Sequence, residues 1–433
     1  MKINLLVKKI LRYNPKADVD LVKKAYNFAR IAHKGQKRAS KQSYIQHPLS
    51  AAIILADLKL DEATIAAALM HDTLEMTNTK LDDIKKNFGN EIALLVDGTT
   101  NVDKFNSYNS ENLKKILLAT IKDIRVIFVK LADKLHNMQT LQYIPKDRQK
   151  LFAQEVLDVY APIAYRLGMW NMKNELEDLS FKFLFPSEYR KISKKVNEIR
   201  KTGIKKIRIV KHMLQRELKK NHIKAEIYGR IKHLYSIYRK LDTKDRTIEQ
   251  IYDITALRIV TDSIENCYSI LGIIHNIWKP IPNTLKDYIA IPKPNMYQSL
   301  HTDVVIDSKP VEFQIRTRNM HEIAENGIAA HWRYKEVSIE KFDTKLSWLK
   351  QFIEWKRDFK DIKFDFLEDN IMAFTPKGDV IDLPIGSCPI DFAYAIHSSI
   401  GDKATGANIN NKFVPLKTEI KNGDIVEIIT SKH

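Results

Sequence analysis

The sequence predicts a multidomain protein in which an all-α domain comes first, an α/β domain with a mixed sheet second and a small α+β domain last. From about residue 20 to residue 185, apolar residues recur at helical spacing and the loops are short. Beyond a basic stretch that ends near residue 222, β-like segments alternate with helical patterns, as in a mixed sheet with covering helices. The pattern changes once more near residue 370. A chain of 433 residues is long enough to divide into several domains, each with its own core.

We expect five segments: a helical domain 1–185, a basic helical connector 186–222, an α/β domain 223–340, a helical linker 341–369 and a small domain 370–433. The α/β domain is expected to have strands at 225–228, 254–260, 302–306 and 311–315 and helices at 234–240 and 267–278. In the small domain, 374–379 is expected to be a turn between two short strands, 389–399 a helix and 424–430 a strand.

Polar residues interrupt two apolar helices of the first domain. The run 63–70 ends at His71 and Asp72, and the helix 125–138 places Asp133 and Asn137 one turn apart on one face. Together with His47, these residues supply two imidazoles and two carboxylates that can close around one divalent cation. Buried polar side chains need a partner, and a metal ion is one that suits these ligands.

Each of these residues also has an ordinary structural explanation. His47 precedes Pro48 at the start of a helix, His71 can cap the end of one, and Asp133 can pair with a neighbouring lysine, Lys130 or Lys134. From the residues alone, a metal site and a set of unrelated structural contacts both stay open.

The α/β domain contains a second polar cluster. Period-2 alternation over 311–316 buries Val311, Phe313 and Ile315 and turns Glu312, Gln314 and Arg316 to the opposite face. That face is either a site or the solvent-exposed side of an antiparallel sheet.

Upstream of this strand, the segment 229–240 runs from a strand into a helix. Arg230 and Lys232 lie just before the N-terminus of this helix, where cations and free backbone N–H groups can hold phosphate. Asp253 opens the next strand, within reach of Glu312 for sharing a magnesium ion.

Composition indicates a soluble, cytoplasmic protein with one strongly basic stretch. The net charge is +18, and thirteen Lys or Arg residues against two Glu lie between residues 189 and 222. This stretch is either a solvated connecting helix or a surface for nucleotides or ribosomal RNA. With two cysteines there is no disulfide framework, and no apolar run reaches the length of a membrane span, so we expect a reducing compartment and no membrane partner.

The segments 44–48, 71–72 and 131–138 resemble the HD-type hydrolase domain of the RelA/SpoT homologues, the enzymes that make and degrade the alarmone (p)ppGpp. The resemblance implies that His47, His71, Asp72 and Asp133 bind Mn²⁺, although the ligand types alone leave iron, cobalt and zinc open. It further implies that Glu75 orients or deprotonates the attacking water. The expected substrate-binding residues of this domain are Arg38, Tyr44 and Asn137.

The segments 228–240, 252–260, 286–290, 297–302 and 312–316 look like the nucleotidyltransferase-like (p)ppGpp synthetase domain of the same family. The resemblance implies that Asp253 and Glu312 serve Mg²⁺ and the attacking hydroxyl, and that Tyr297 stacks on guanine. The residues expected to hold ATP are Arg230, Lys232, Ser236 and Lys240. Further substrate-binding residues are expected to be Lys286, Lys293, Asn295, His301 and Gln314.

From about residue 370 the chain resembles the small, ubiquitin-like TGS module of the long family members, which adds the ribosome or tRNA to the partners ATP, GTP or GDP, and (p)ppGpp. The implied reactions are pyrophosphoryl transfer from ATP to the 3′-hydroxyl of GTP or GDP, and hydrolysis of the 3′-pyrophosphate of (p)ppGpp. Two alternatives are a synthetase-only enzyme and an RNA-binding regulator whose catalytic sites have decayed.

Three departures from the family pattern bear on these activities. Glu75-Met76 stands where hydrolase members carry Glu-Asp, Asn283-Thr284 replaces Gly-Arg, and Met296 replaces Gly before Tyr297. Met76 cannot accept a proton, so we expect hydrolysis to be weakened more than synthesis.

Overall fold

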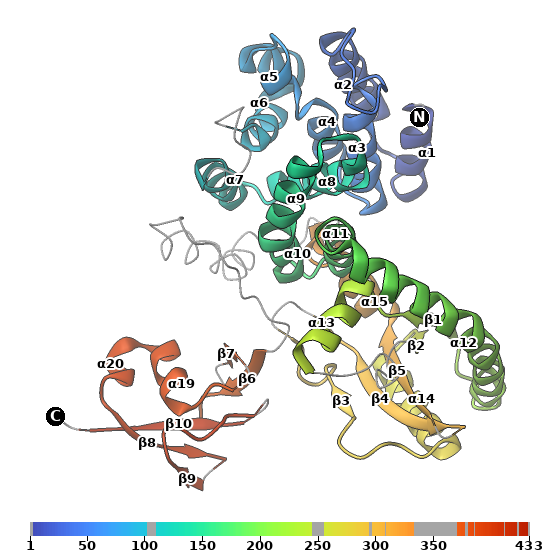
Figure 1. Cartoon of the computed structure of the whole chain (residues 1–433), viewed down its shortest axis with the longest axis vertical. Helices are drawn as coiled ribbons and strands as arrows, with labels where there is room; N and C mark the ends of the chain where they lie inside the picture. The colour runs from blue at the N-terminus through green and yellow to red at the C-terminus, as the bar shows by residue number, and fades with distance from the viewer. Residues whose placement is uncertain are drawn as a thin grey trace. The chain divides into compact units, whose positions relative to one another are not determined.

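The computed structural model describes residues 3–101, 110–244, 255–293, 297–307, 309–332, 370–376, 380–384, 386–410, 412–421 and 424–431. It divides into two compact units, Met1–Lys363 and Phe364–His433 (Figure 1). No helix of the described residues is long and apolar enough to cross a membrane. The five segment boundaries expected from the sequence stay a prediction.

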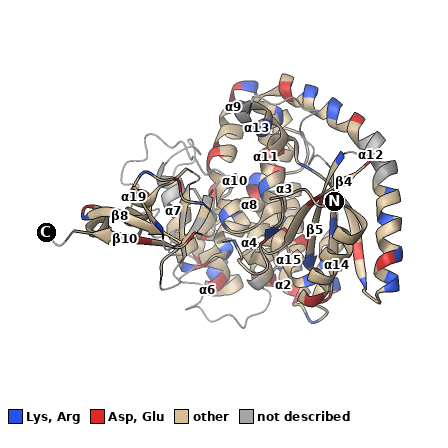
Figure 2. Cartoon of the chain, turned by 90° about the horizontal axis from the view of Figure 1, so that it is seen from below, with Lys and Arg blue, Asp and Glu red and all other residues tan. Residues whose placement is uncertain are grey.

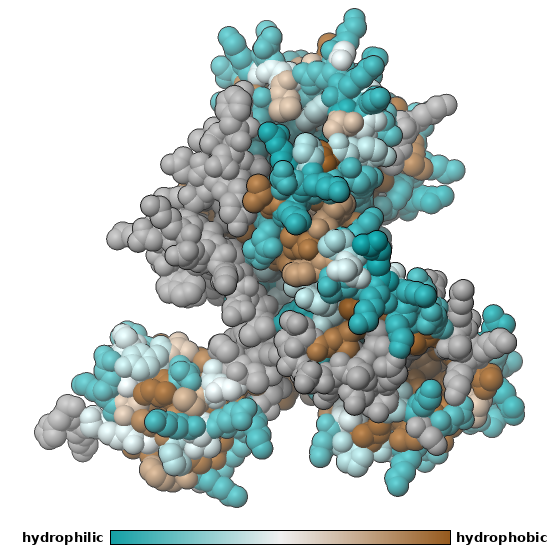
Figure 3. All heavy atoms as spheres, in the orientation of Figure 1, coloured by the Kyte–Doolittle hydropathy of each residue, from teal (hydrophilic) through white to brown (hydrophobic). Residues whose placement is uncertain are grey.

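The first unit begins with helices throughout, as predicted. Their bounds are α1 Ile3–Tyr13, α2 Val19–Ala32, α3 Gln46–Asp57, α4 Glu62–Met70, α5 Thr73–Met76, α6 Leu81–Thr99, α7 Ser110–Lys122, α8 Arg125–Gln139, η1 Leu141–Tyr143, α9 Lys146–Glu155, the π-helix η2 Val156–Tyr160, α10 Ala161–Arg166 and α11 Trp170–Leu184. Their outer surface is largely hydrophilic in the space-filling view (top of Figure 3).

At the centre of this bundle, α3, α4 and α8 pack against one another. The helix α4 begins where the Asp61 carboxylate accepts a hydrogen bond of 2.9 Å from the backbone N–H of Thr64. It is apolar on all sides and almost wholly buried, which suits a central helix. Both α3 and α8 are also mostly buried, so polar side chains on these three helices are held away from bulk water.

The basic connector is one long helix, α12, from Pro186–Lys220. Its first half places Ile192 and Val196 against Phe181 and Ile237, and its second half places Leu214 against the sheet domain. Figure 2 shows lysines and arginines spread along this helix, and most of those whose side chains the structure describes are exposed, such as Lys195, Arg208 and Lys219. This helix therefore joins two cores and exposes much of its described positive charge.

The sheet of the first unit is mixed, as predicted. Its elements are β1 Ala225–Ile231, α13 Leu234–Lys244, β2 Thr255–Thr261, α14 Ile264–Ile277, β3 Lys286–Asp287, β4 Leu300–Ile306, β5 Lys309–Thr317, α15 Arg318–Asn326 and α16 Ile328–Trp332. The strand order is β1-β2-β5-β4-β3, with β2 and β5 parallel and the other pairs antiparallel. The short strand β3 was not predicted. One face of the sheet packs on α14 through Phe313 and Ile315 of β5, whereas Val311 is only half-buried.

The second unit has the α+β composition predicted for it. Its elements are β6 Asn370–Phe374, β7 Val380–Pro384, α19 Pro389–Ile396, α20 Ser398–Gly401, β8 Ala404–Ile409, β9 Lys412–Val414 and β10 Val426–Thr430, and Phe392 is at its core. Part of the turn expected at 374–379 lies outside the described residues.

The single helix predicted for 389–399 is wrong. The helix ends at Ile396 because His397 adopts an extended conformation (φ −167°, ψ 139°), and its imidazole accepts from the N–H of Ser399 to begin α20. The strands β8 and β9 were also missed.

Within the first unit, the helical half meets the sheet half at Gly327. Gly327 follows α15 with φ +58°, and the next residue, Ile328, donates its backbone N–H to the carbonyl of Leu167 at 2.9 Å. A Cβ atom on Gly327 would lie 2.1 Å from the Leu167 carbonyl oxygen and 2.7 Å from the nitrogen of Met169. Only glycine fits this seam without movement of the backbone.

We predict that Gly327→Ala destabilises the first unit more than Gly89→Ala does. Both glycines have positive φ, but a Cβ on Gly89 meets nothing within 4 Å, so the control carries only the backbone strain of about 1–3 kcal/mol. Urea unfolding of both variants measures the difference. Equal losses of unfolding free energy in the two variants would mean that the backbone around Gly327 makes room for a Cβ atom without cost.

Candidate active sites

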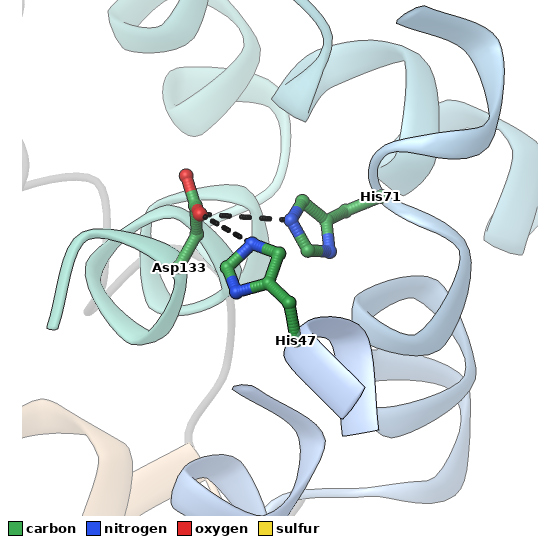
Figure 4. A group of neighbouring side chains, drawn as sticks. All are labelled: His47, His71 and Asp133. Atoms are coloured by element: carbon green, nitrogen blue, oxygen red, sulfur yellow. Dashed lines mark ion pairs between the residues drawn. The ribbon is translucent and has the colours of Figure 1, made fainter. Parts of the chain in front are cut away.

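A cluster of two imidazoles and a carboxylate lies inside the helical half, where three segments meet (Figure 4). His47 comes from the first turn of α3, His71 from the end of α4 and Asp133 from the middle of α8. Asp133 Oδ1 lies 3.1 Å from Nε2 of His47 and 3.6 Å from Nε2 of His71. All three side chains are buried, and one ligand atom from each lies within 4.8 Å of the others. Three donors at this spacing can share one ion.

Asp72 lies beside this cluster. Its Oδ1 is 3.2 Å from Nε2 of His71 and its Oδ2 is 3.5 Å from Nε2 of His47. Tyr44 donates its hydroxyl to Asp72 Oδ2 at 2.9 Å, and Asn137 donates its amide to Asp133 Oδ1 at 2.6 Å. The structure thus brings together all four side chains that the sequence suggested as ligands.

The far nitrogen of each imidazole is fixed by a hydrogen bond. Nδ1 of His71 lies 2.8 Å from the carbonyl oxygen of Ala68, which can only accept, so this nitrogen carries a proton. Nδ1 of His47 lies 2.7 Å from Nδ1 of His136. With His47 donating there, the Nε2 atoms of both imidazoles face the carboxylates, and both could bind a metal ion that displaces the Nε2 proton of His71.

The electrostatics of the cluster favour added positive charge. Burial lowers the pKa of His71, but the carboxylates of Asp72 and Asp133 outweigh it and raise this pKa to about 9. Burial and the neighbouring His47 lower the pKa of His136 to about 3, so His136 is neutral at pH 7 and can accept from His47. The carboxylates hold a proton on His71, and a divalent cation would supply that charge instead.

The donor set fits a divalent cation in a further respect. Within the described residues, Nε2 of His71 is buried and forms no hydrogen bond of acceptable geometry, although Asp72 lies close. A buried nitrogen that has ion pairs but no well-aligned hydrogen bond is incompletely satisfied, and coordination to a metal ion would satisfy it. Two imidazole nitrogens and two carboxylates suit a first-row ion of intermediate softness.

Glu75 and Met76 lie on the short helix α5 beside the cluster. The Glu75 carboxylate accepts hydrogen bonds from the backbone N–H and the side-chain amide of Asn101, at 3.2 and 3.3 Å. The side chain of Met76 is 47% exposed, so it is not packed in the bundle. A carboxylate at position 76 would therefore remain solvated.

Arg38 closes one side of the same site. Its guanidinium donates to Asn137 Oδ1 at 2.5 Å and lies 5.8 Å from the ring of Tyr44. A guanidinium beside an aromatic ring can bind a phosphate or stack on a base.

A second polar cluster lies on the sheet, on neighbouring strands. Glu312 of β5 lies 3.0 Å from Nδ1 of His301 on β4 and accepts a bond of 3.0 Å from the amide of Gln314. His301 Nε2 lies 2.8 Å from the hydroxyl of Tyr297. Burial raises the pKa of Glu312, but the bond from His301 outweighs it and lowers this pKa to about 2. Glu312 is therefore an ionised acceptor in a largely enclosed place.

The face that carries Glu312 is more buried than alternation alone suggests. Gln314 and Arg316 are each 1% exposed. Glu325 of α15 holds both Arg316, at 2.8 Å, and Arg258 of β2, at 2.7 Å. The possibility that these side chains line a solvent-exposed sheet face is wrong.

The remaining predicted residues of the sheet site surround this cluster or cannot be placed. Arg230, on β1, is near enough to Glu312 and His301 to influence the pKa of each. The ammonium of Lys293 lies 4.9 Å from the ring of Tyr288, and Lys286 pairs with His301 in the β3–β4 register. Half-buried positions of the β1–α13 segment include Lys232, Ser236 and Lys240. The residues outside the described part are Asp253, Asn295 and Met296.

Comparison with known proteins decides the family. The HD domain matches residues 25–170, the region found in RelA / SpoT proteins matches 229–338 and the TGS domain matches 371–430. The chain is 47% identical over 440 residues to a protein named GTP pyrophosphokinase from Myxococcus xanthus, covering 98% of this chain and 58% of that protein. The chain belongs to the RelA/SpoT family.

A second bacterial relative agrees with the RelA/SpoT assignment. A protein of a Synechocystis strain, named probable guanosine-3′,5′-bis(diphosphate) 3′-pyrophosphohydrolase, is 46% identical over 433 residues, covering 95% of this chain and 57% of that protein. A solved structure, described as a metazoan ortholog of SpoT that hydrolyzes ppGpp, is 25% identical with a TM-score of 0.30, covering 37% of this chain and 94% of that one. The chain spans less than two thirds of the length of these two bacterial relatives.

Sequence reasoning missed several residues that contact the two polar clusters or their neighbours. His136 follows Asp133 by three positions, so it shares its helix face, and this spacing was the signal available. Asn101, Arg258 and Glu325 reach their partners only through the tertiary fold. No local sequence pattern predicts the contacts of these three residues.

The substitution at 283–284 has a structural account. Asn283 adopts φ +62°, a conformation that Asn tolerates better than most residues, in place of the usual Gly. Thr284 uses its hydroxyl to donate to the carbonyl of Ile281 and to accept from the N–H of Asp303. The loop is thus held without the usual arginine.

Proposed function

We propose that this chain makes and degrades (p)ppGpp at two separate sites, one in the helical half and one on the sheet. The observation that carries the proposal is that the two polar clusters contain different chemical groups. The first offers His47, His71 and Asp133 with Asp72 beside them, and the second an ionised Glu312 among aromatic and cationic groups. The first suits a transition metal and the second a magnesium-nucleotide.

For hydrolysis, we assign His47, His71, Asp72 and Asp133 as the ligands of Mn²⁺. When bound, such an ion makes water more acidic and polarises a phosphate oxygen. Glu75, held by Asn101, orients the attacking water and accepts its proton. The guanosine and phosphate groups of (p)ppGpp are bound by Arg38, Tyr44 and Asn137. The products are GTP or GDP and pyrophosphate.

For synthesis, Glu312 and Asp253 serve Mg²⁺ and the attacking group. Glu312 takes the proton of the 3′-hydroxyl of GTP or GDP as that oxygen bonds to the β-phosphorus of ATP, and AMP leaves with the electron pair. Tyr297, held by His301, stacks on the guanine. The residues assigned to ATP are Arg230, Lys232, Ser236 and Lys240. The other assigned contacts are Lys286, Lys293, Asn295 and Gln314.

The domains are assigned accordingly: hydrolase 1–185, connector 186–222, synthetase 223–340, linker 341–369 and TGS module 370–433. The TGS module is proposed to bind the ribosome or tRNA. The exposed arginines and lysines among the described residues of α12 would favour the approach of nucleotides or RNA.

A synthetase-only enzyme is the second candidate, and Met76 is the observation that favours it. Where hydrolase members carry an acid, this chain has an exposed thioether that can neither accept a proton nor hold water strongly. Glu75 is then the one residue of the Glu75-Met76 pair that can act as an acid or a base.

One pair of variants tests the two-site proposal. Asp72→Asn should abolish Mn²⁺-dependent ppGpp hydrolysis and leave synthesis within a few-fold, because it removes a metal ligand of the helical site. Glu312→Gln should do the reverse, with synthesis falling about 100-fold or more since a base or ligand is lost. Both reactions are assayed by nucleotide separation on each variant. Loss of both activities in either variant would indicate one shared site.

A second prediction concerns Met76. Met76→Asp should raise ppGpp hydrolysis, since acid–base assistance is commonly worth about 10²- to 10⁴-fold when neighbouring groups are in place. Because the side chain is 47% exposed, the melting temperature should hardly change. Hydrolysis with Mn²⁺ is measured for both proteins. A wild type as fast as the variant would show that Glu75 suffices.

A further inference from the structure

A buried lysine lies between two of the acidic residues of the helical site, Asp133 and Glu75. Lys130 lies on α8, one turn before Asp133, and is 4% exposed. Its ammonium donates to the carbonyl oxygen of Thr99 at 3.2 Å and to Oδ1 of Asn101 at 3.1 Å, and it lies 3.8 Å from Oδ2 of Asp133. One cation thus faces a candidate metal ligand on one side and Asn101 on the other.

Asn101 contacts Glu75 as well as Lys130. Its Oδ1 must face Lys130, because an ammonium only donates, and its NH₂ must face the Glu75 carboxylate, which only accepts. Both Asn101 donors reach that carboxylate, the backbone N–H at 3.2 Å and the side-chain amide at 3.3 Å, on different oxygens. The orientation of the amide is therefore determined by its two neighbours.

The helix that carries Glu75 gives it little support of its own. Helix α5 spans only Thr73–Met76, and Glu75 is half-buried at its end. Without a tether its side chain would sample several rotamers, and proton transfer requires the base within hydrogen-bond reach of the water. Two hydrogen bonds to separate oxygens restrict both the direction and the rotation of the carboxylate.

We propose that Lys130 and Asn101 are positioning residues of the hydrolase, which set the Glu75 carboxylate at a fixed place relative to Asp133. This inference rests on the proposed hydrolysis of (p)ppGpp. Lys130 fixes the Asn101 amide, and Asn101 fixes Glu75. Because Lys130 also faces Asp133, the positions of the Glu75 base and of the Asp133 carboxylate both depend on this one ammonium group.

Asn101→Asp is the sharpest variant. It keeps the size of the side chain and an oxygen for Lys130, but it replaces the donor to Glu75 by a second carboxylate that repels it. A purely structural role for Asn101 would survive this change, whereas positioning of Glu75 would not. Asn87→Asp is the matched control, because Asn87 is exposed on α6 and its amide donates only to the carbonyl of Asp83 among the contacts of the described residues.

The experiment is a double-mutant cycle of Asn101→Asp and Glu75→Gln, followed by single-turnover ppGpp hydrolysis with Mn²⁺ and enzyme in excess. We expect Asn101→Asp to lower the hydrolysis rate at saturating enzyme about 10-fold or more in the wild-type background and less than about twofold in the Glu75→Gln background. Mn²⁺ affinity, melting temperature and synthesis should stay at wild-type values, as they should for Asn87→Asp.

Three results would overturn the inference. One is an equal loss from Asn101→Asp in both backgrounds, which would mean that Asn101 acts independently of Glu75. Another is a fall in Mn²⁺ affinity that accounts for the lost rate. A wild type without any Mn²⁺-dependent hydrolysis would instead remove the proposed hydrolase itself, and the inference with it.

Discussion

The structure of the helical half depends on two carboxylates and two imidazoles that lie together in its interior, largely away from water. Ionised groups in a protein interior are stable only when they are paired, hydrogen-bonded or bound to a metal ion. Here the carboxylates of Asp72 and Asp133 face His47 and His71 across the junction of α3, α4 and α8. The apolar surfaces of these helices bring the charges together, and the carboxylates are balanced either by a protonated His71 or by a bound cation.

The groups around this cluster are arranged to keep it in one geometry. His136 and the carbonyl of Ala68 hold the two imidazoles, and Asn137 holds Asp133. The sheet site follows another principle, since Glu312 is held by neighbouring side chains of the same sheet. One site is assembled from helices distant in sequence, and the other from adjacent strands. The two can therefore be altered separately.

The sequence predicted the elements whose period is strong and missed contacts made across the fold. Helix α8 and strand β5 follow from apolar periodicity, and with them the shared faces of Asp133 with Asn137 and of Glu312 with Gln314. The break at His397 was missed because a side-chain cap decided it within an apolar helical pattern. Burial of Arg316 was missed because its partner Glu325 comes from the following helix, which alternation along the strand does not reveal.

Whether the helical cluster binds a divalent cation can be measured by thermal unfolding after removal of metal. Metal-free protein is melted with and without Mn²⁺, beside Asp133→Asn treated in the same way. At about 100 times the dissociation constant, binding to the folded state adds roughly 2.7 kcal/mol, so the wild-type transition should rise by several degrees and that of Asp133→Asn should hardly move. An equal rise in both proteins, or none in the wild type, would contradict the assignment.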